Sequence, residues 1–160
     1  MQTFLPFADF RKSAAVLDWR RLGKQRVECK QLLAALGYGI EDQTLAYLGI
    51  HAKGYANHPC TQMWKGYEQS LAEYQTIIIE EWIRRGYRNT MLCVPVTEPV
   101  AQTPDWFGDE RIHRSHRSRL MQKDSVHYGQ FSWTDPTDLR YEWPIRQADG
   151  SYKLEHRGNG

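Results

Sequence analysis

The sequence predicts a mainly α-helical fold: a compact single-domain helical bundle, followed by an irregular C-terminal tail rich in aromatic residues and proline. Apolar residues recur at steps of three and four in the long segments, which is the helical period. Capping residues such as Asp9 precede these segments, and glycines such as Gly37 and Gly86 follow them, as at natural helix ends. The chain has 160 residues, the length of one domain. We expect residues 1–145 to form that domain and residues 146–160 a tail or small hairpin.

The N-terminal part of the chain predicts three helices after an apolar lead-in. Residues 1–7 are expected to lie extended against the core. Asp9 is the expected N-cap of a short helix over 10–17. A longer helix is expected over 18–36, because apolar residues recur along it and glycine follows it. A further short helix is expected over 41–50.

The rest of the chain predicts two long helices and a hairpin. His58 precedes a proline that suits the first helical position, and the apolar stripe after it predicts one continuous helix over 59–85, buried in the core. Three prolines in 92–107 predict an extended linker on the surface. Acidic residues open a helix over 110–123, where they favour the helix dipole. Asp-Gly at 149–150 predicts a turn between short strands.

Composition excludes several classes of protein. Hydrophobic residues make up 41% of the chain, too many for a disordered protein. No apolar run approaches the ~18–20 residues that cross a bilayer, and the start lacks a signal pattern, so we expect no membrane association and a cytoplasmic location. The three cysteines, Cys29, Cys60 and Cys93, form neither a disulfide framework nor a zinc knuckle. No metal or cofactor is expected.

The formal net charge of +2 hides an uneven distribution of charge. Segment 11–30 holds seven basic residues against Asp18 and Glu28, and segment 111–123 holds five basic residues and no acid. A charged run is often only a solvated surface. Two such segments, interrupted by polar hydrogen-bonding residues, favour contacts with phosphates.

One face of the predicted helix over 18–36 carries Asp18, Arg21, Gln25 and Glu28, at helical spacing. These residues are either surface ion pairs of small energetic value or the polar wall of a catalytic cleft, where a carboxylate could stabilise a developing cation. His58, at a helix start, is either a simple cap or a group that faces a cleft. A helix N-terminus disfavours positive charge, so we expect its imidazole to be neutral.

The basic helix over 110–123 places Arg119 and Lys123 on one face, with Arg114 and Arg117 beside it. Basic residues followed by aromatic ones suit binding of a nucleic-acid backbone with base stacking. The alternative is a helix that binds an acidic protein. His113 and His116 are three residues apart, but zinc would need further ligands that the sequence does not supply nearby.

Several motifs in residues 1–144 carry a resemblance to a known family. They are Met1-Gln2-Thr3-Phe4-Leu5-Pro6, Arg21-Leu22-Gly23-Lys24-Gln25-Arg26-Val27-Glu28, Asn57-His58-Pro59, Met63-Trp64-Lys65-Gly66-Tyr67, Arg85-Gly86-Tyr87 and His113-Arg114-Ser115-His116-Arg117-Ser118. With them the chain resembles the pyrimidine-dimer DNA glycosylase (endonuclease V-like) family, in a bacterial and phage branch. Characterised members are compact and all-helical. They bend DNA, flip a nucleotide, cut the glycosidic bond at a pyrimidine dimer and nick the backbone at the abasic site.

The resemblance implies double-stranded DNA as the partner, and we expect a monomer. It implies that Arg26, Arg119 and Lys123 grip phosphates and that the polar face of the helix over 18–36 borders the reacting sugar. We assign DNA contacts to the basic and amide side chains of both segments, which are Lys24, Gln25, Arg26, Arg114, Arg117, Arg119 and Lys123.

The sequence departs from the family pattern at two places. Characterised members use the α-amino group of an N-terminal Thr, whereas residue 2 here is Gln. The family's catalytic Glu follows an Arg, whereas this chain has Arg20-Arg21, so Asp18 or Glu28 would supply the carboxylate. We therefore expect a DNA glycosylase with Asp18, Arg21, Glu28 and His58 in its active site, and its lyase activity stays open. The alternatives are a DNA- or RNA-binding protein that kept the fold without the chemistry, or a phage–host protein-interaction module.

Overall fold

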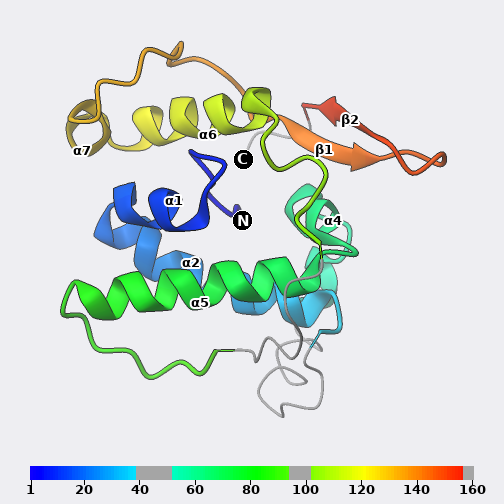
Figure 1. Cartoon of the computed structure of the whole chain (residues 1–160), viewed down its shortest axis with the longest axis horizontal. Coiled ribbons are helices and arrows are strands. Elements are labelled where there is room, and N and C mark those ends of the chain that lie inside the picture. The colour runs from blue at the N-terminus through cyan, green and yellow to red at the C-terminus, as the bar shows by residue number, and fades with distance from the viewer. Residues whose placement is uncertain (39–51, 94–101, 157–160) are drawn as a thin grey trace.

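The computed structural model describes residues 1–38, 52–93 and 102–156 (Figure 1). Its elements are α1 (Phe10–Val16), α2 (Trp19–Ala35), the 3-10 helix η1 (Ala52–Tyr55), α4 (Pro59–Trp64), α5 (Glu68–Arg84), α6 (Glu110–Lys123), α7 (Ser125–Gly129), β1 (Trp143–Arg146) and β2 (Tyr152–Glu155). The mainly α fold class is therefore confirmed. The short helix expected over 41–50 lies outside the described residues.

The first five residues run through the centre of the molecule, between α6 on one side and the pair α2 and α5 on the other (Figure 1). Leu5 is fully buried, its N–H donates to His116 Nδ1 at 2.9 Å, and its carbonyl lies 2.8 Å from His113 Nδ1. The Tyr74 hydroxyl donates to the carbonyl of Phe4 at 2.6 Å. The expected lead-in thus belongs to the core, because side chains of α5 and α6 satisfy its backbone polar groups.

The first two helices both begin at an aspartate cap, of which the sequence predicted Asp9. Asp9 accepts a hydrogen bond from the backbone N–H of Lys12 at 2.8 Å and begins α1. Asp18 caps α2 through the N–H groups of Arg20 and Arg21. After α2, Gly37 has a φ of +74°, the left-handed conformation common at helix ends.

The single helix predicted over 59–85 is wrong, because the chain breaks between α4 and α5. Lys65 leaves the helix with a ψ of 123°, and Gly66 has a φ of +87°, which residues with a side chain rarely adopt. The Gly66 N–H donates to the Glu68 carboxylate at 2.9 Å, which supports the start of α5. The break directs α4 away from the axis of α5, so that α4 contacts β1 (Figure 1). The core role predicted for the apolar stripe is confirmed, since Trp64 and Leu71 are fully buried.

The surface linker predicted over 92–107 is wrong in its last described residues. Trp106 is 1% exposed, and its indole N–H donates to the carbonyl of Met63 at 2.9 Å. The chain turns inward here because a large aromatic ring is worth more in the core than on the surface.

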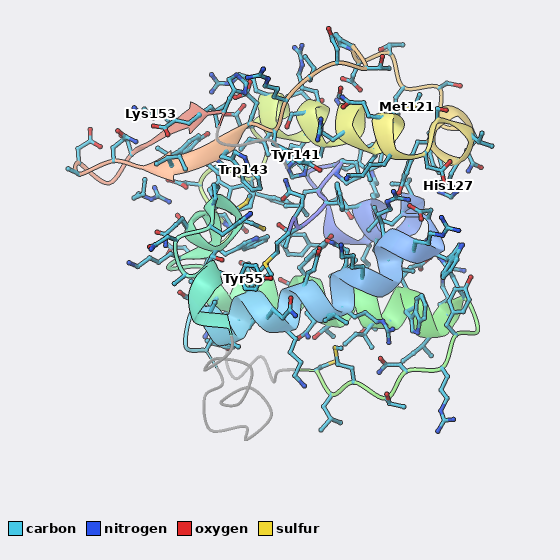
Figure 2. All side chains as sticks on the ribbon, turned by 180° about the vertical axis from the view of Figure 1, so that it is seen from behind. Tyr55, Met121, His127, Tyr141, Trp143 and Lys153 are labelled. Atoms are coloured by element: carbon cyan, nitrogen blue, oxygen red, sulfur yellow. The ribbon has the colours of Figure 1, made fainter. Side chains whose placement is uncertain are left out.

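The predicted hairpin forms, with β1 antiparallel to β2 and Trp143 opposite Glu155. It begins at Trp143, inside the expected range 1–145, and turns at Gly150, which has a φ of +86°. Arg146 fixes it to the chain before α6 by two bonds to the Asp105 carboxylate, at 2.6 and 3.0 Å. Figure 2 shows Tyr141 and Trp143 near one end of α6 and His127 at the other.

A hydrogen bond connects α7 to the beginning of α2: the Tyr128 hydroxyl donates to the Asp18 carboxylate at 2.6 Å. Asp109 caps α6 by accepting from the N–H of Arg111 at 3.1 Å, as the acidic start of that segment predicted. Among the described residues, none of the helices combines the length and the apolar character needed to span a bilayer.

Candidate functional site

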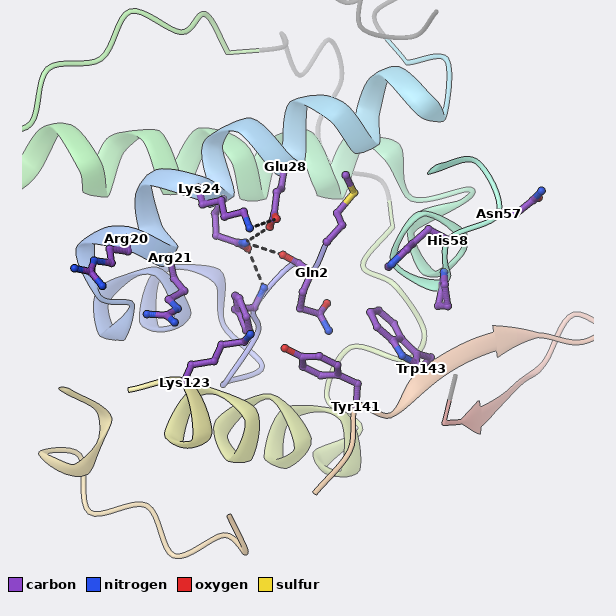
Figure 3. A pocket seen from close by; sticks show the side chains of 14 residues that line it. Gln2, Arg20, Arg21, Lys24, Glu28, Asn57, His58, Lys123, Tyr141 and Trp143 are labelled. Carbon is purple, nitrogen blue, oxygen red and sulfur yellow. Dashed lines mark hydrogen bonds and ion pairs between the residues drawn. The ribbon is translucent and has the colours of Figure 1, made fainter. Parts of the chain in front are cut away.

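A pocket of about 550 Å³ lies between α2 and α6, with the first residues of the chain at its floor (Figure 3). Six of the predicted site residues line it: Arg21, Lys24, Gln25 and Glu28 of α2, His58 before α4, and Lys123 of α6. The two basic segments of the sequence therefore meet at one pocket, which gives a near-neutral protein a locally positive surface.

Glu28 is the carboxylate among the described residues that line this pocket. It is 7% exposed. One carboxylate oxygen accepts from the Gln25 amide at 2.9 Å, and the other lies 3.5 Å from the Lys24 ammonium. Its position on the third turn of α2 brings it opposite the aromatic rings of residues 141 and 143 (Figure 3).

Gln25 holds this carboxylate in place, and both of its amide hydrogens are used within the protein. Its Nε2 donates to Glu28 and, at 2.7 Å, to the carbonyl of Gln2. Its Oε1 accepts from the Phe4 N–H at 2.9 Å and lies 3.1 Å from the Tyr74 hydroxyl oxygen, whose hydrogen goes to the Phe4 carbonyl. Gln25 is fully buried, so the structure places it beneath the pocket rather than at a surface that duplex DNA could reach.

Asp18, the other candidate carboxylate, does not line the pocket. It is 4% exposed and accepts from the N–H groups of Arg20 and Arg21, from the Arg21 guanidinium at 3.3 Å and from the Tyr128 hydroxyl. Burial alone would raise the pKa of Asp18, but the Tyr128 hydrogen bond and the charge of Arg21 outweigh it and hold this pKa below its ordinary value. Asp18 therefore fixes the start of α2 and orients Arg21.

Positive charge collects at the side of the pocket between the two helices. Burial lowers the pKa of Lys123, and the charges of Arg119, Arg21 and Lys24 lower it further. A phosphate bound beside these cations would relieve their mutual repulsion. Arg119 lies behind this group, with its guanidinium 5.0 Å from the centre of the Tyr141 ring.

His58 is the N-cap of α4 as well as a pocket residue. Its Nδ1 accepts from the N–H of Cys60 at 3.0 Å, and its ring meets Trp143 edge to face at 5.9 Å. Burial lowers the pKa of His58, and the positive charge of the Met1 amine adds to this effect. The imidazole is therefore neutral near pH 7, as expected for a cap, with Nε2 as its free ring nitrogen.

Aromatic side chains form the wall opposite α2, and sequence reasoning missed their role. Tyr141 and Trp143 line the pocket together with Phe4. Burial raises the pKa of Tyr141 to about 12, so its hydroxyl stays protonated. From the sequence, Trp143 was interpreted only as an anchor of the tail, and Tyr141 was given no role.

Four predicted DNA contacts do not line the pocket: Arg26, Arg114, Arg117 and Arg119. The Arg26 guanidinium is 4.2 Å from the centre of the Trp82 ring and donates to Asn89 at 2.7 Å. The Arg117 guanidinium donates to the Asp135 carboxylate at 2.7 and 3.0 Å. Arg114 is exposed on the outer side of α6 and does not line the pocket. Their contacts with DNA stay predictions.

The two histidines of α6 serve the fold. His113 and His116 both bind the backbone of Leu5, and burial lowers the pKa of His116 to about 3. Within the three described stretches of the chain, no group of three or more His, Cys, Asp or Glu side chains could hold a metal ion.

The comparisons with known proteins give one match. A family model described as pyrimidine dimer DNA glycosylase matches residues 1–94. No curated protein and no solved structure matches the chain. The matched region contains α2 and the start of α4, hence Glu28 and His58. Lys123 and the aromatic wall lie beyond it.

Proposed function

The chain belongs to the pyrimidine dimer DNA glycosylase family, and from this we propose that it is a DNA N-glycosylase that draws a damaged or modified base out of duplex DNA into the pocket between α2 and α6. The observation that carries the proposal is Glu28, a nearly buried carboxylate beside cations from two helices and opposite an aromatic wall. We expect the protein to act as a monomer.

Glu28 is proposed to stabilise the sugar during cleavage of the bond between base and deoxyribose. Departure of the base leaves positive charge on the ring oxygen and C1′, as in the hydrolysis of sugars. A carboxylate held by Gln25 at 2.9 Å needs little reorganisation to face this charge. Its burial supports the proposal, because a charge in a partly dry site acts more strongly than one in water.

Arg21, Lys24 and Lys123 are proposed to bind the phosphates on either side of the extruded nucleotide. Arg21 is held by Asp18 at 3.3 Å, so its guanidinium is already oriented before DNA arrives. Burial and then the charges of Arg119, Arg21 and Lys24 lower the pKa of Lys123, and a phosphate would neutralise these cations. These contacts are independent of sequence and would make binding sensitive to salt.

Tyr141 and Trp143 are proposed to receive the base. Extruding a base costs a few kcal/mol and is least costly where the base is damaged or mispaired, which selects the lesion. Stacking on aromatic rings contributes ~1–3 kcal/mol per base and offsets part of this cost. His58, whose ring meets Trp143, would contact the base or the adjacent phosphate through its free ring nitrogen.

Either water or an amine then attacks C1′. Attack by an amine forms a Schiff base with the sugar and permits a second step, in which the strand is cut at the abasic site. Met1 lines the pocket, so its α-amino group is the candidate for that route. Attack by water would leave an abasic site and an intact strand.

The test uses end-labelled duplexes that contain one thymine dimer, one abasic site or no lesion. We expect the protein to act on the dimer duplex, and Glu28→Gln to slow this reaction by roughly 10²–10³-fold, the usual effect of removing one group that stabilises the transition state. The matched control is Glu80→Gln, a half-exposed carboxylate on α5 that pairs with Arg11 outside the pocket. DNA affinity should be similar in all three proteins.

The outcomes separate the candidates. Strand breaks that appear only after alkali indicate attack by water, and an adduct trapped by borohydride on the abasic duplex indicates the amine. Salt-sensitive binding without cleavage of any duplex would contradict the glycosylase and favour the non-catalytic nucleic-acid-binding protein. Absence of DNA affinity would favour the protein-interaction module. Full activity of Glu28→Gln would remove Glu28 from the mechanism.

A further inference from the structure

Gln2 carries a buried polar group without a partner, and that group faces the pocket. The residue is 4% exposed and lines the pocket, yet its Nε2 has no hydrogen-bond partner among the described residues. A buried donor without an acceptor is unfavourable, and buried polar groups in native proteins are almost always paired. The missing acceptor is therefore expected on a molecule that enters the pocket.

A chain of hydrogen bonds reaches the Oε1 end of the Gln2 amide and leaves its NH₂ group without an acceptor. The Trp64 indole can only donate, and it donates to Thr3 Oγ1 at 2.9 Å. The Thr3 hydroxyl hydrogen is then available for Cys60 Sγ at 3.8 Å, and the Cys60 thiol can donate to Gln2 Oε1, also at 3.8 Å. Burial raises the pKa of Cys60 to about 12, so the thiol keeps its hydrogen. With Oε1 occupied, the NH₂ group is left for a ligand.

The surroundings of this NH₂ group suit a flat heterocycle. Figure 3 shows the Gln2 amide between Glu28 on one side and the rings of Tyr141 and Trp143 on the other. A base that stacks on these rings presents its edge to the amide, while its sugar remains near the carboxylate.

We propose that Gln2 is a specificity-determining residue: its Nε2 donates a hydrogen bond to a ring carbonyl oxygen of the pyrimidine that enters the pocket. This inference rests on the proposed function, because it concerns the base of the extruded nucleotide. Cys60 acts as a positioning residue, since its thiol orients the Gln2 amide without touching the base.

The test compares two nucleotides of the same shape. Thymidine 5′-monophosphate has two ring carbonyls, and its 2,4-difluorotoluene isostere has fluorine atoms in their place, which are very poor acceptors. Loss of one neutral hydrogen bond in a closed site corresponds to a change in affinity on the order of threefold to tenfold. We expect the protein to bind thymidine 5′-monophosphate more tightly than the isostere by that factor.

Variants assign this preference to Gln2. In Gln2→Met the side chain keeps its length but cannot donate a hydrogen bond, so this variant should bind both nucleotides equally. The variant Gln2→Glu should do the same. The control Gln130→Met changes an exposed glutamine of the α7 end, bonded to the carbonyl of His127, and should keep the preference. Binding is followed by nuclear magnetic resonance titration, and the fold of each variant by thermal unfolding.

Cys60 provides a second, independent measurement. Cys60→Ala removes the donor that orients the amide and should reduce the preference, whereas Cys60→Ser restores a donor and should rescue it. Equal affinity of the unmodified protein for both nucleotides, no binding of either, or a preference that survives in Gln2→Met overturns the inference. If the preference is present but the dimer duplex is never cleaved, the glycosylase proposal fails while recognition of the base by Gln2 stands.

Discussion

The substitution Tyr128→Phe removes one hydroxyl group and should weaken the contact between α7 and α2. The hydroxyl donates to the Asp18 carboxylate at 2.6 Å and accepts from the Asp18 N–H at 3.1 Å, and both residues are buried. Hydrogen bonds to charged groups contribute about 1.5–3 kcal/mol. The ring itself is kept, so packing against Trp133 is unchanged. We expect the free energy of unfolding to fall by about 2 kcal/mol at pH 7, measured by urea unfolding.

The pH dependence of this loss tests its cause. The folded-state pKa of Asp18 lies below its ordinary value of 3.8, so its ionisation stabilises the fold above that pH and this contribution disappears as the pH falls through the folded-state pKa. As the pH falls through this folded-state pKa the carboxyl becomes protonated, and the difference between Tyr128→Phe and the unmodified protein should shrink to about 1 kcal/mol. Tyr87→Phe, on the surface, should change stability by less than about 0.5 kcal/mol. A loss below 0.5 kcal/mol at pH 7, or one that does not vary with pH, would refute the reasoning.

Three further predictions concern α2 and α6. A Cβ on Gly23 would lie 3.0 Å from the Trp82 ring. Gly23→Ala should therefore not show the increase of ~1 kcal/mol in the free energy of unfolding that the higher helix propensity of alanine would give. An increase of that size, measured by urea unfolding, would contradict the close approach. Arg117 donates to Asp135 at 2.7 and 3.0 Å and to the carbonyl of Pro6 at 2.7 Å. Arg117→Lys should therefore lower the free energy of unfolding by about 2–3 kcal/mol and leave DNA affinity at matched salt unchanged. An unchanged melting temperature together with weaker DNA binding would instead identify Arg117 as a phosphate contact. Lys123→Ala should weaken binding to all duplexes alike and reduce the salt dependence of the association constant by about one unit of slope, and an unaltered slope would exclude a phosphate contact.

Much of the helical framework could be predicted because its signals are local. Asp9, Asp18 and Asp109 satisfy the first backbone N–H groups of α1, α2 and α6, and this depends only on nearby residues. The break at Gly66 was missed because the apolar stripe continues across it. A glycine is tolerated inside a helix, and only the packing of α4 against β1 decides that it bends the chain here.

The pocket could be predicted in part. Helical spacing placed Arg21 and Glu28 on one face of α2, and both line the pocket. Spacing could not show that Gln25, on the same face, lies under the N-terminal segment, or that the Tyr128 hydroxyl binds the Asp18 carboxylate. Both contacts depend on segments that are distant in the sequence. Gln2 and Tyr141 were missed for the same reason, since each reaches the pocket only through the tertiary fold.

The central position of the first residues has a consequence for synthesis of the chain. Leu5 leaves the ribosome more than a hundred residues before its backbone partners His113 and His116 are made. Such distant contacts form late, because their loop-closure entropy is lost before the contacts are gained. Until α6 has been synthesised, the apolar N-terminal residues cannot be buried in a complete core. This segment of the growing chain is therefore exposed to aggregation and chaperone binding until α6 is made.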